Sequence, residues 1–459
     1  MEQKTKTLAR DWRDTPLVHV LRPMQRFIHN ETASGIVLMA ATVAALVLAN
    51  SPLAQPYDAL LHTKIGITVG PFALSETLAH WINDGLMALF FFLVGMELKR
   101  EALAGELANP RQALLPILAA IGGAALPAVI YTLINWGGPG APGWGVPMAT
   151  DIAFALGVLA LLGSRVPWAL KVFLTAVAVI DDLLAVLVIA LFYSDGLNLG
   201  ALGIGLGVLV LLAVVNMLGI RLLLVYVTLG LVVWLAFLQS GVHATLAGVL
   251  VALTIPARSR IDHESFLSRA YGLLEQFRHS DATESPLLTD ERQEQAVLEL
   301  EDACESVQAP LQKLEHQLQP WVAFGVMPVF ALANAGVALS AEGLAGEGLP
   351  VVLGIAAGLV LGKPVGLFAA TWLAVRLGVA QLPQGVTWQH IAGAGCLAGL
   401  GFTMSLFIAT LGFEGAPELL AAAKLGILVA SLVAGLLGYA ALRLAAPAPE
   451  PQQAPAASG

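Results

Sequence analysis

Charged residues are scarce in this chain of 459 residues. Only 12% of the residues are charged, whereas 57% are hydrophobic and the mean hydropathy is +0.79. Soluble domains carry about 25% charged residues, so this composition excludes an ordinary soluble protein. It predicts an all-α polytopic membrane protein that contacts the lipid bilayer. The formal net charge of -9 comes largely from one acidic stretch, and no basic surface indicates binding to nucleic acid.

Cysteine is nearly absent as well. Cys304 lies in a hydrophilic segment and Cys396 in an apolar one, which argues against a disulfide framework or a cysteine metal site. We therefore expect no resident cofactor. The first thirty residues are polar and basic without a short apolar core, so we expect no cleaved signal peptide.

What the chain has in abundance is apolar segments that approach the roughly 20 residues a helix needs to cross a bilayer. About twelve occur, near residues 35–50, 81–94, 113–135, 140–162, 168–193, 199–218, 222–238, 241–255, 321–339, 350–375, 390–411 and 419–442. Lys and Arg gather at alternate span ends, as at Lys99, Arg100 and Arg111, which places both termini in the cytoplasm. The predicted parts are a cytoplasmic N-terminal segment (1–33), spans one to eight (34–260), a cytoplasmic acidic insert (261–319), spans nine to twelve (320–443) and a disordered tail (444–459).

Two connecting segments predict structure of their own. Residues 64–74 are typical of two short strands around a Gly70-Pro71 turn, a hairpin on the periplasmic face. An isolated hairpin is marginal in water, so we expect it to pair with a second copy or to lie against the protein. In the insert, apolar residues recur at helical spacing and predict one amphipathic helix: Val297, Leu300, Cys304, Val307 and Leu311.

Four ionisable residues lie deep within the apolar segments: Asp151, Asp181, Asp182 and Lys363. A charge at that depth costs several kcal/mol and indicates a functional site. Adjacent residues on a helix point about 100° apart, so one of the paired aspartates can meet Lys363 while the other faces a water-filled path. Such a site can hold either protons or a hard cation, and each expels the other.

Two glycine-rich stretches predict interrupted helices. One precedes Thr150-Asp151 and the other precedes Thr403 and Ser405. Unwound backbone at depth is tolerated where it lines a cavity, and its free amide and carbonyl ends can bind ions. Each stretch is the middle span of a three-span set, over 113–193 and 350–442, and the two sets start on opposite sides. The sequence therefore predicts two inverted three-helix repeats.

Three functions use buried carboxylates of this kind. Cation exchange by competition is the leading hypothesis, and it makes the chain a secondary transporter and not an enzyme. An intramembrane aspartyl protease needs two acids on facing elements, which Asp151 and Asp182 could supply. A passive cation channel would conduct without regard to the proton gradient.

Several motifs resemble those of the NhaA-type sodium/proton antiporter family along nearly the whole chain. They occupy residues 81–87, 149–157, 180–182, 240–248, 333–336, 362–364 and 401–405, and include Ala149-Thr150-Asp151-Ile152-Ala153-Phe154-Ala155-Leu156-Gly157 and Gly401-Phe402-Thr403-Met404-Ser405. The resemblance implies a bacterial inner-membrane protein with inverted repeats and broken helices. It also implies electrogenic export of sodium and lithium, driven by inward protons and activated as pH rises.

The resemblance further implies roles for single residues. Asp181 and Asp182 would be the cation- and proton-binding pair, with Asp181 salt-bridged to Lys363 in the empty site. Thr150 would be a neighbouring oxygen ligand, and Asp151 would offset helix-end charges where the broken spans cross. The implied pH-response residues are Glu97, Glu101, His243, Glu315 and His316. A homodimer through the 64–74 hairpin is also expected. Gln319, where the family pattern has histidine, and the long acidic insert depart from that pattern and affect the expected pH response.

Overall fold

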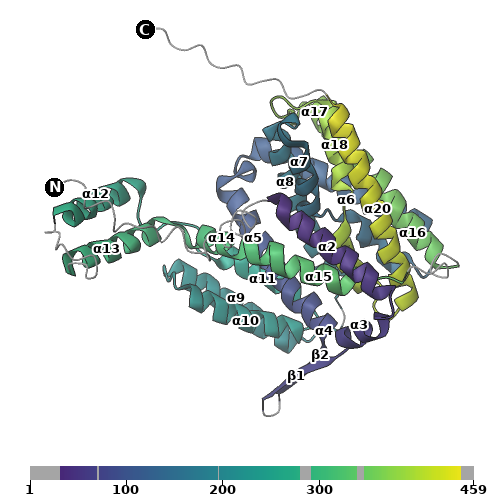
Figure 1. Cartoon of the computed structure of the whole chain (residues 1–459), viewed down its shortest axis with the longest axis horizontal. Helices are drawn as coiled ribbons and strands as arrows, with labels where there is room; N and C mark the ends of the chain where they lie inside the picture. Colours follow the sequence, from purple (N-terminus) through teal and green to yellow (C-terminus); the bar gives the residue numbers. More distant parts are fainter. Residues whose placement is uncertain (1–30, 70–71, 195, 280–290, 339–345, 446–459) are drawn as a thin grey trace, which may run out of the picture. The chain divides into compact units, whose positions relative to one another are not determined.

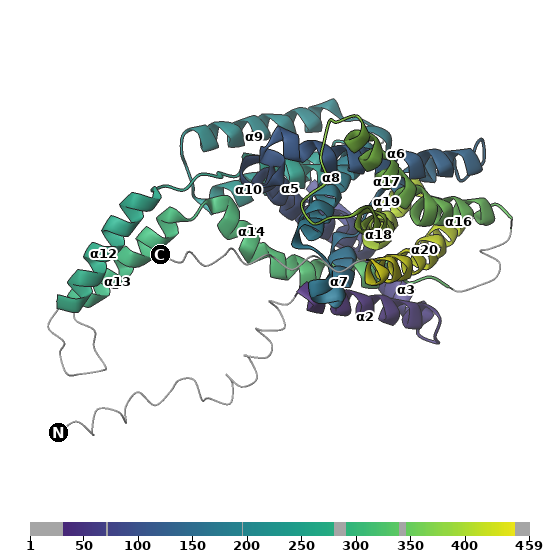
Figure 2. The same ribbon diagram turned by 90° about the horizontal axis from the view of Figure 1, so that it is seen from above.

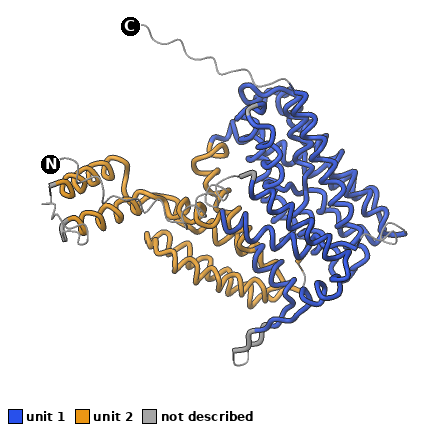
Figure 3. The backbone as a smooth tube through the Cα atoms, viewed as in Figure 1, with its two compact units in different colours: residues 1–87, 109–193, 320–459 blue, residues 88–108, 194–319 orange. Residues whose placement is uncertain are grey.

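The computed structural model describes residues 31–69, 72–194, 196–279, 291–338 and 346–445. The chain forms two compact units, coloured blue and orange in Figure 3. Unit 1 comprises residues 1–87, 109–193 and 320–459, and unit 2 comprises residues 88–108 and 194–319. All the residues that the sequence placed at the ion site belong to unit 1.

The described residues of unit 1 form helices, one pair of strands and the segments that connect them. Its short helical turns are α4 (Leu78–His80), η2 (Trp81–Leu86), η4 (Ala141–Met148), η5 (Gly163–Arg165), η6 (Val322–Val326) and η8 (Gly358–Gly362). Its longer helices are α2 (Glu31–Ala49), α3 (Ala54–Leu61), α6 (Pro110–Ile134), α7 (Ile152–Leu162), α8 (Trp168–Phe192), α15 (Met327–Asn334), α16 (Gly348–Ala357), α17 (Lys363–Arg376), α18 (Trp388–Ala398), α19 (Phe402–Gly412) and α20 (Pro417–Leu444). Figures 1 and 2 show α16 and α20 side by side, as their contacts require.

Seven helical stretches of the described residues are long and apolar enough to cross a membrane. Two bent pairs raise the number to nine if each pair is one span: α2 with α3, bent by 114°, and α18 with α19, bent by 43°. Each of the twelve predicted apolar segments falls on one or more helices. The all-α polytopic class is thus confirmed, while the count of twelve and the inverted repeats stay predictions.

Helix α6 approaches η8 and α17 backbone to backbone, with glycines at the contact. A Cβ atom on Gly366 would lie 2.2 Å from the carbonyl oxygen of Gly122, and one on Gly362 would lie 2.9 Å from the Cα of Pro127. Small residues at this spacing let membrane helices come close. The glycines of residues 350–375 therefore allow this close packing.

Two π-helical turns precede prolines within helices. Turn η8 comes just before Lys363-Pro364, and η6 comes just before Met327-Pro328. Proline lacks an amide hydrogen and collides with the carbonyl one turn earlier, and a wider π turn relieves this conflict locally. Lys363 is consequently the first residue of α17, at a point where the regular helix hydrogen bonds are already interrupted.

Unit 2 has a separate apolar core. Its elements are α5 (Met87–Ala104, from residue 88), η3 (Glu106–Ala108), α9 (Leu199–Met217), α10 (Leu223–Leu238), α11 (Ala244–Thr254), α12 (His263–His279), α13 (Glu291–Val307) and α14 (Pro310–Trp321, to residue 319). Helices α9 and α10 lie side by side (Figure 1). Met96, Leu212, Phe237 and Ile255 are buried together in the core that these helices form.

The prediction of an amphipathic helix in the insert is wrong about where the helix ends and about which face is buried. Helix α13 stops at Val307, so Leu311 belongs to α14. The buried residues are Ala296 and Ala303, whereas Val297 is 49% exposed. Helix α13 packs against α12 (Figures 1 and 2), and the small alanines lie on its buried side. The prediction rested on the spacing of hydrophobic residues, which does not show on which side of α13 the helix α12 packs.

Strands β1 (Lys64–Val69) and β2 (Phe72–Thr77) pair antiparallel, with Lys64 opposite Thr77 and Val69 opposite Phe72. The second strand extends beyond the predicted end at residue 74. Gly70 and Pro71 lie outside the described residues, so the predicted turn and its periplasmic location stay predictions.

The chain ends differ slightly from the predicted boundaries. Helix α2 begins at Glu31, before the predicted limit at residue 34, and α20 continues to Leu444, one residue into the predicted tail. Residues 1–30 and 446–459 lie outside the described part of the chain.

Candidate functional site

Two interrupted helices meet in unit 1. The 3-10 helix η4 ends at Met148 and α7 begins at Ile152, while α18 ends at Ala398 and α19 begins at Phe402. Pro147 lies just before the first break, and Gly399 and Gly401 lie within the second. The glycine-rich stretches that predicted interruptions therefore lie where the helices break.

Direct hydrogen bonds join the two breaks. The amide of Asp151 donates to the carbonyl of Leu400 over 2.5 Å, and the hydroxyl of Ser405 donates to the carbonyl of Val146 over 2.7 Å. The hydroxyl oxygen of Thr150 lies 2.9 Å from the carbonyl oxygen of Ala398. Each break thus satisfies backbone groups that the other leaves without an intrahelical partner.

Asp151 caps two helices at once. Its Oδ1 accepts from the amide of Phe154 over 3.1 Å, at the start of α7. Its Oδ2 accepts from the amide of Thr403 over 3.1 Å and from the Thr403 hydroxyl over 2.5 Å, at the start of α19. Helix N-termini carry partial positive charge, so two of them stabilise a carboxylate that is only 1% exposed.

Lys363 and Asp181 form a completely buried ion pair. The ammonium Nζ lies 2.8 Å from Asp181 Oδ2, and neither side chain is exposed. Lys363 also donates to the carbonyl of Met148, at the end of η4. The Thr150 hydroxyl lies 2.6 Å from the same Asp181 oxygen. Because a hydroxyl has one hydrogen, Thr150 can donate either to Asp181 or to the carbonyl of Ala398.

Oxygen atoms suitable for a hard cation gather around this pair. Asp182, also completely buried, interacts electrostatically with Lys363. Asp181 Oδ1 is buried and accepts no hydrogen bond from the described residues. Small hard cations bind carboxylate, hydroxyl and carbonyl oxygens. Asp181, Asp182 and Thr150 are therefore the residues that could hold a cation, and Lys363 occupies one of their oxygens in this structure.

Comparisons with known proteins place this arrangement in a family. The family described as Na+/H+ antiporter 1 matches residues 25–442. The chain belongs to this family. It is 52% identical to Na+/H+ antiporter NhaA of Oleidesulfovibrio alaskensis, over 96% of this chain and 97% of that one. It is 49% identical to Na+/H+ antiporter NhaA of Koribacter versatilis, over 96% of each chain, and 49% identical to Na+/H+ antiporter NhaA 1 of Saccharophagus degradans, over 92% and 91%.

Most residues linked to the pH response by resemblance to the family lie in one charged cluster of unit 2. Arg100 binds two acids, with Nη2 3.0 Å from Glu101 Oε1 and Nε 3.0 Å from Glu315 Oε1. Glu97 interacts electrostatically with both acids. His316, next to Glu315, is exposed and acts on it electrostatically.

Burial raises the pKa of Glu315 above its ordinary value, and the neighbouring Arg100 guanidinium opposes the shift. His243 lies apart from this cluster. It precedes α11, whose far end binds Lys99 through the carbonyls of Leu253 and Ile255. Eleven residues of helix separate the two ends by about 16 Å. The structure thus unites four of the five candidate residues.

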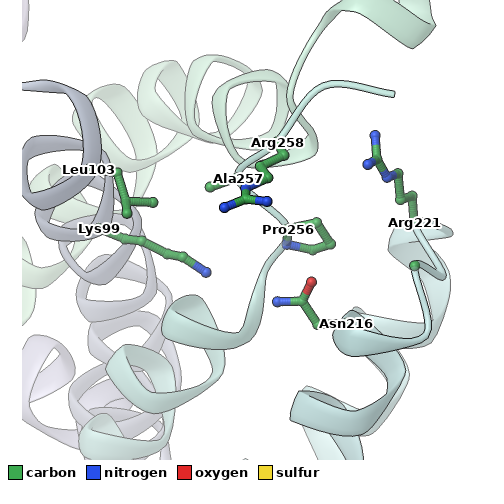
Figure 4. A pocket seen from close by; sticks show the side chains of 8 residues that line it. Lys99, Leu103, Asn216, Arg221, Pro256, Ala257 and Arg258 are labelled. Carbon is green, nitrogen blue, oxygen red and sulfur yellow. The ribbon is translucent and has the colours of Figure 1, made fainter. Parts of the chain in front are cut away.

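A basic pocket of about 350 Å³ lies beside this end of α11 (Figure 4). Three cationic side chains line it: Lys99, Arg221 and Arg258. Lys99 donates to the last carbonyls of α11, and Asn216 donates to the carbonyl of Thr254 over 2.9 Å. These bonds cap the helix C-terminus, where positive charge is favourable. None of the predicted ion-site residues lines the pocket.

Sequence reasoning missed several partners at the ion site. Thr403 was singled out as a neighbour of the second break but not as a ligand of Asp151. Its hydroxyl beside a glycine-rich break was the available signal. The carbonyls of Met148 and Ala398 carry no sequence signal, because every residue has a carbonyl and only the fold decides which one is free.

The buried ion pair predicts that one single substitution lowers the free energy of unfolding more than the double substitution does. Lys363→Met leaves Asp181 buried without its counter-charge, which costs about 3–5 kcal/mol of unfolding free energy. Adding Asp181→Asn removes the uncompensated charge and should restore a large part of that loss. Urea unfolding of the purified proteins in detergent measures both effects.

Lys424→Met is the matched control. It removes an ammonium from α20, and this ammonium forms no ion pair with any of the described residues. It should cost much less than Lys363→Met. Equal stability of the single and double variants would contradict the role of the pair.

Proposed function

We propose that this protein exchanges sodium for protons across the bacterial inner membrane, at Asp181 and Asp182. The observation that carries the proposal is the buried Lys363–Asp181 pair beside Asp182, where two interrupted helices cross. Family membership supports it, because the relatives are named Na+/H+ antiporters. Lithium, as a small hard cation, fits the same oxygens.

The proposed mechanism is competition for shared oxygen atoms. A cation that enters takes Asp182, Asp181 and the Thr150 hydroxyl oxygen as ligands and displaces the Lys363 ammonium from Asp181. Protons that return to the carboxylates expel the cation. The numbers of protons that move inward and of sodium ions that move outward are unequal, which makes the exchange electrogenic. The membrane potential therefore contributes to the driving force.

The geometry argues against a protease. An aspartyl dyad needs two acids free to face one substrate, but both oxygens of Asp151 are occupied in capping α7 and α19. Asp181 and Asp182 are neighbours on one helix. A channel would need no ammonium within the cation site, and a transport rate that ignores the proton gradient would favour that alternative.

Asp182→Asn should abolish sodium-dependent proton release. The substitution keeps the size of the side chain but removes a negative charge and a titratable group. Proton release on sodium addition is measured with purified protein and a pH-sensitive dye, and exchange is measured in proteoliposomes. Asp302→Asn, at an exposed position of α13, should behave as wild type. Full exchange by the Asp182 variant would remove the basis of the proposed mechanism.

Protonation of Glu315 is proposed to control activation by pH. The pKa of Glu315 is raised by burial, so the carboxylate gains its proton at a higher pH than usual and its ion pair with Arg100 weakens there. Glu315→Gln imitates the protonated form at every pH. It should therefore extend the low-activity state and shift the rise of exchange activity to higher pH.

The matched control for this shift is Glu305→Gln, since Glu305 pairs with Lys313 at the surface and is 61% exposed. Its exchange activity should follow the wild-type pH profile. A Glu315 variant that also does so, with pH-activity curves recorded in proteoliposomes, would count against this control of activation.

The strand pair is proposed to join two copies in a homodimer. Strands β1 and β2 form a sheet of only two strands among the described residues, so each has an edge available to another copy. Replacing residues 65–76 by a Gly/Ser linker should convert dimers to monomers, as measured by chemical cross-linking and mass determination in detergent. The same replacement at residues 280–290 should leave the dimer intact. Persistence of the dimer in the first variant would exclude this interface.

A further inference from the structure

Two tyrosine hydroxyls hold the outer part of η4. Tyr131, on α6, donates to the carbonyl of Gly140 over 2.7 Å. Tyr193, directly after α8, donates to the carbonyl of Pro142 over 2.7 Å and accepts from the amide of Gly145 over 3.3 Å. Tyr131 is completely buried. Neither tyrosine belongs to the ion site described above.

The glycines of η4 fit these hydroxyls. A Cβ atom on Gly143 would lie 2.5 Å from the Tyr131 hydroxyl oxygen, and one on Gly145 would lie 2.9 Å from that of Tyr193. The rings of Trp144 and Phe192 also pack edge to face, with centroids 5.0 Å apart. The glycine-rich approach to the first break thus admits two hydrogen-bonding side chains as well as close packing.

The position of η4 matters because it ends in the ion site. Its last residue, Met148, offers the carbonyl that binds Lys363, and Thr150 follows two residues later. A 3-10 helix has poor internal hydrogen-bond geometry, so external contacts must set its position. Tyr193 bonds to its outer part, and Asp181 bonds to Thr150 just beyond its other end. Tyr193 and Asp181 are about 18 Å apart along the direction of α8, at 1.5 Å per residue.

We propose that Tyr193 and Tyr131 are positioning residues for cation binding. Their hydrogen bonds fix the position of η4 relative to α6 and α8. This places the Met148 carbonyl against Lys363 and the Thr150 hydroxyl against Asp181. The proposal rests on the sodium/proton exchange proposed above. It adds a specific requirement, that hydroxyl groups remote from the carboxylates determine how well those carboxylates and Thr150 receive sodium.

Tyr193→Phe tests this requirement, because the ring remains and only the hydroxyl is lost. The carbonyl of Pro142 and the amide of Gly145 then lose their partner, and η4 is less firmly placed. The KM for sodium should rise about three- to tenfold, as expected for one or two hydrogen bonds. The maximal rate per folded transporter should change less than about twofold, since the reacting groups remain. Tyr131→Phe should act in the same direction.

Tyr226→Phe is the matched control. Tyr226 is also buried and donates to a backbone carbonyl, that of Ile220 over 2.8 Å, but it belongs to the core of unit 2. Its loss should leave the KM unchanged. Hydrogen exchange provides a readout of position: amides of residues 146–151 should exchange faster in both η4 variants and at the wild-type rate in the Tyr226 variant.

The outcomes separate this proposal from the proposed function. A wild-type protein without sodium-dependent proton release would refute the exchange itself. With that release intact, an unchanged sodium KM in Tyr193→Phe and Tyr131→Phe would overturn the positioning role. A fall in the maximal rate per folded transporter with an unchanged KM would also overturn it, because the hydroxyls would then act on a step other than sodium binding. If Tyr193→Phe fails to fold, Tyr131→Phe decides by the same measurements.

Combined with Thr150→Val, either substitution should raise the KM by less than the product of the separate effects.

Discussion

Buried charge must be balanced locally, and the ends of interrupted helices supply the balance here. Asp151 lies at the start of both α7 and α19 and accepts backbone amides from each. Lys363 lies against Asp181 and the free carbonyl at the end of η4. A continuous helix has no free amide or carbonyl in its middle. The breaks are therefore what allow these charged side chains to exist deep inside an apolar protein.

The small residues and the prolines follow from the same constraint. Lys363 can reach Asp181 only if α17 lies close to its neighbours, and the contact between Gly366 and Gly122 leaves no room for a side chain. The π turn before Pro364 and the 3-10 form of η4 change the helical register next to the site. These irregular segments gain little from their own hydrogen bonds, so neighbours such as Ser405 and Tyr193 hold them in position.

The sequence was most informative where a residue type contradicts its surroundings. Acids and a lysine within apolar segments indicated the site, and glycine with proline indicated the breaks, because few arrangements of a buried chain tolerate either. The hydrogen-bond partners of these residues were harder to predict from the sequence. The partner of Asp151 is the Thr403 hydroxyl and amide, and that of Lys363 includes the Met148 carbonyl, which only the crossing brings together. The buried face of α13 was missed for the same reason, since α12 decides it.

Charge balance also supports the proposed competition between cation and protons. Asp181 and Asp182 as carboxylates with Lys363 as ammonium carry one net negative charge, and all three are completely buried. A bound sodium ion brings the cluster to neutrality, and a proton held together with it leaves an uncompensated positive charge where burial makes it costly. Ammonium and sodium carry the same charge, so exchange of one for the other on Asp181 requires only a rearrangement of ligands. The proposed competition therefore follows from the charge of the cluster as well as from the shared oxygen atoms.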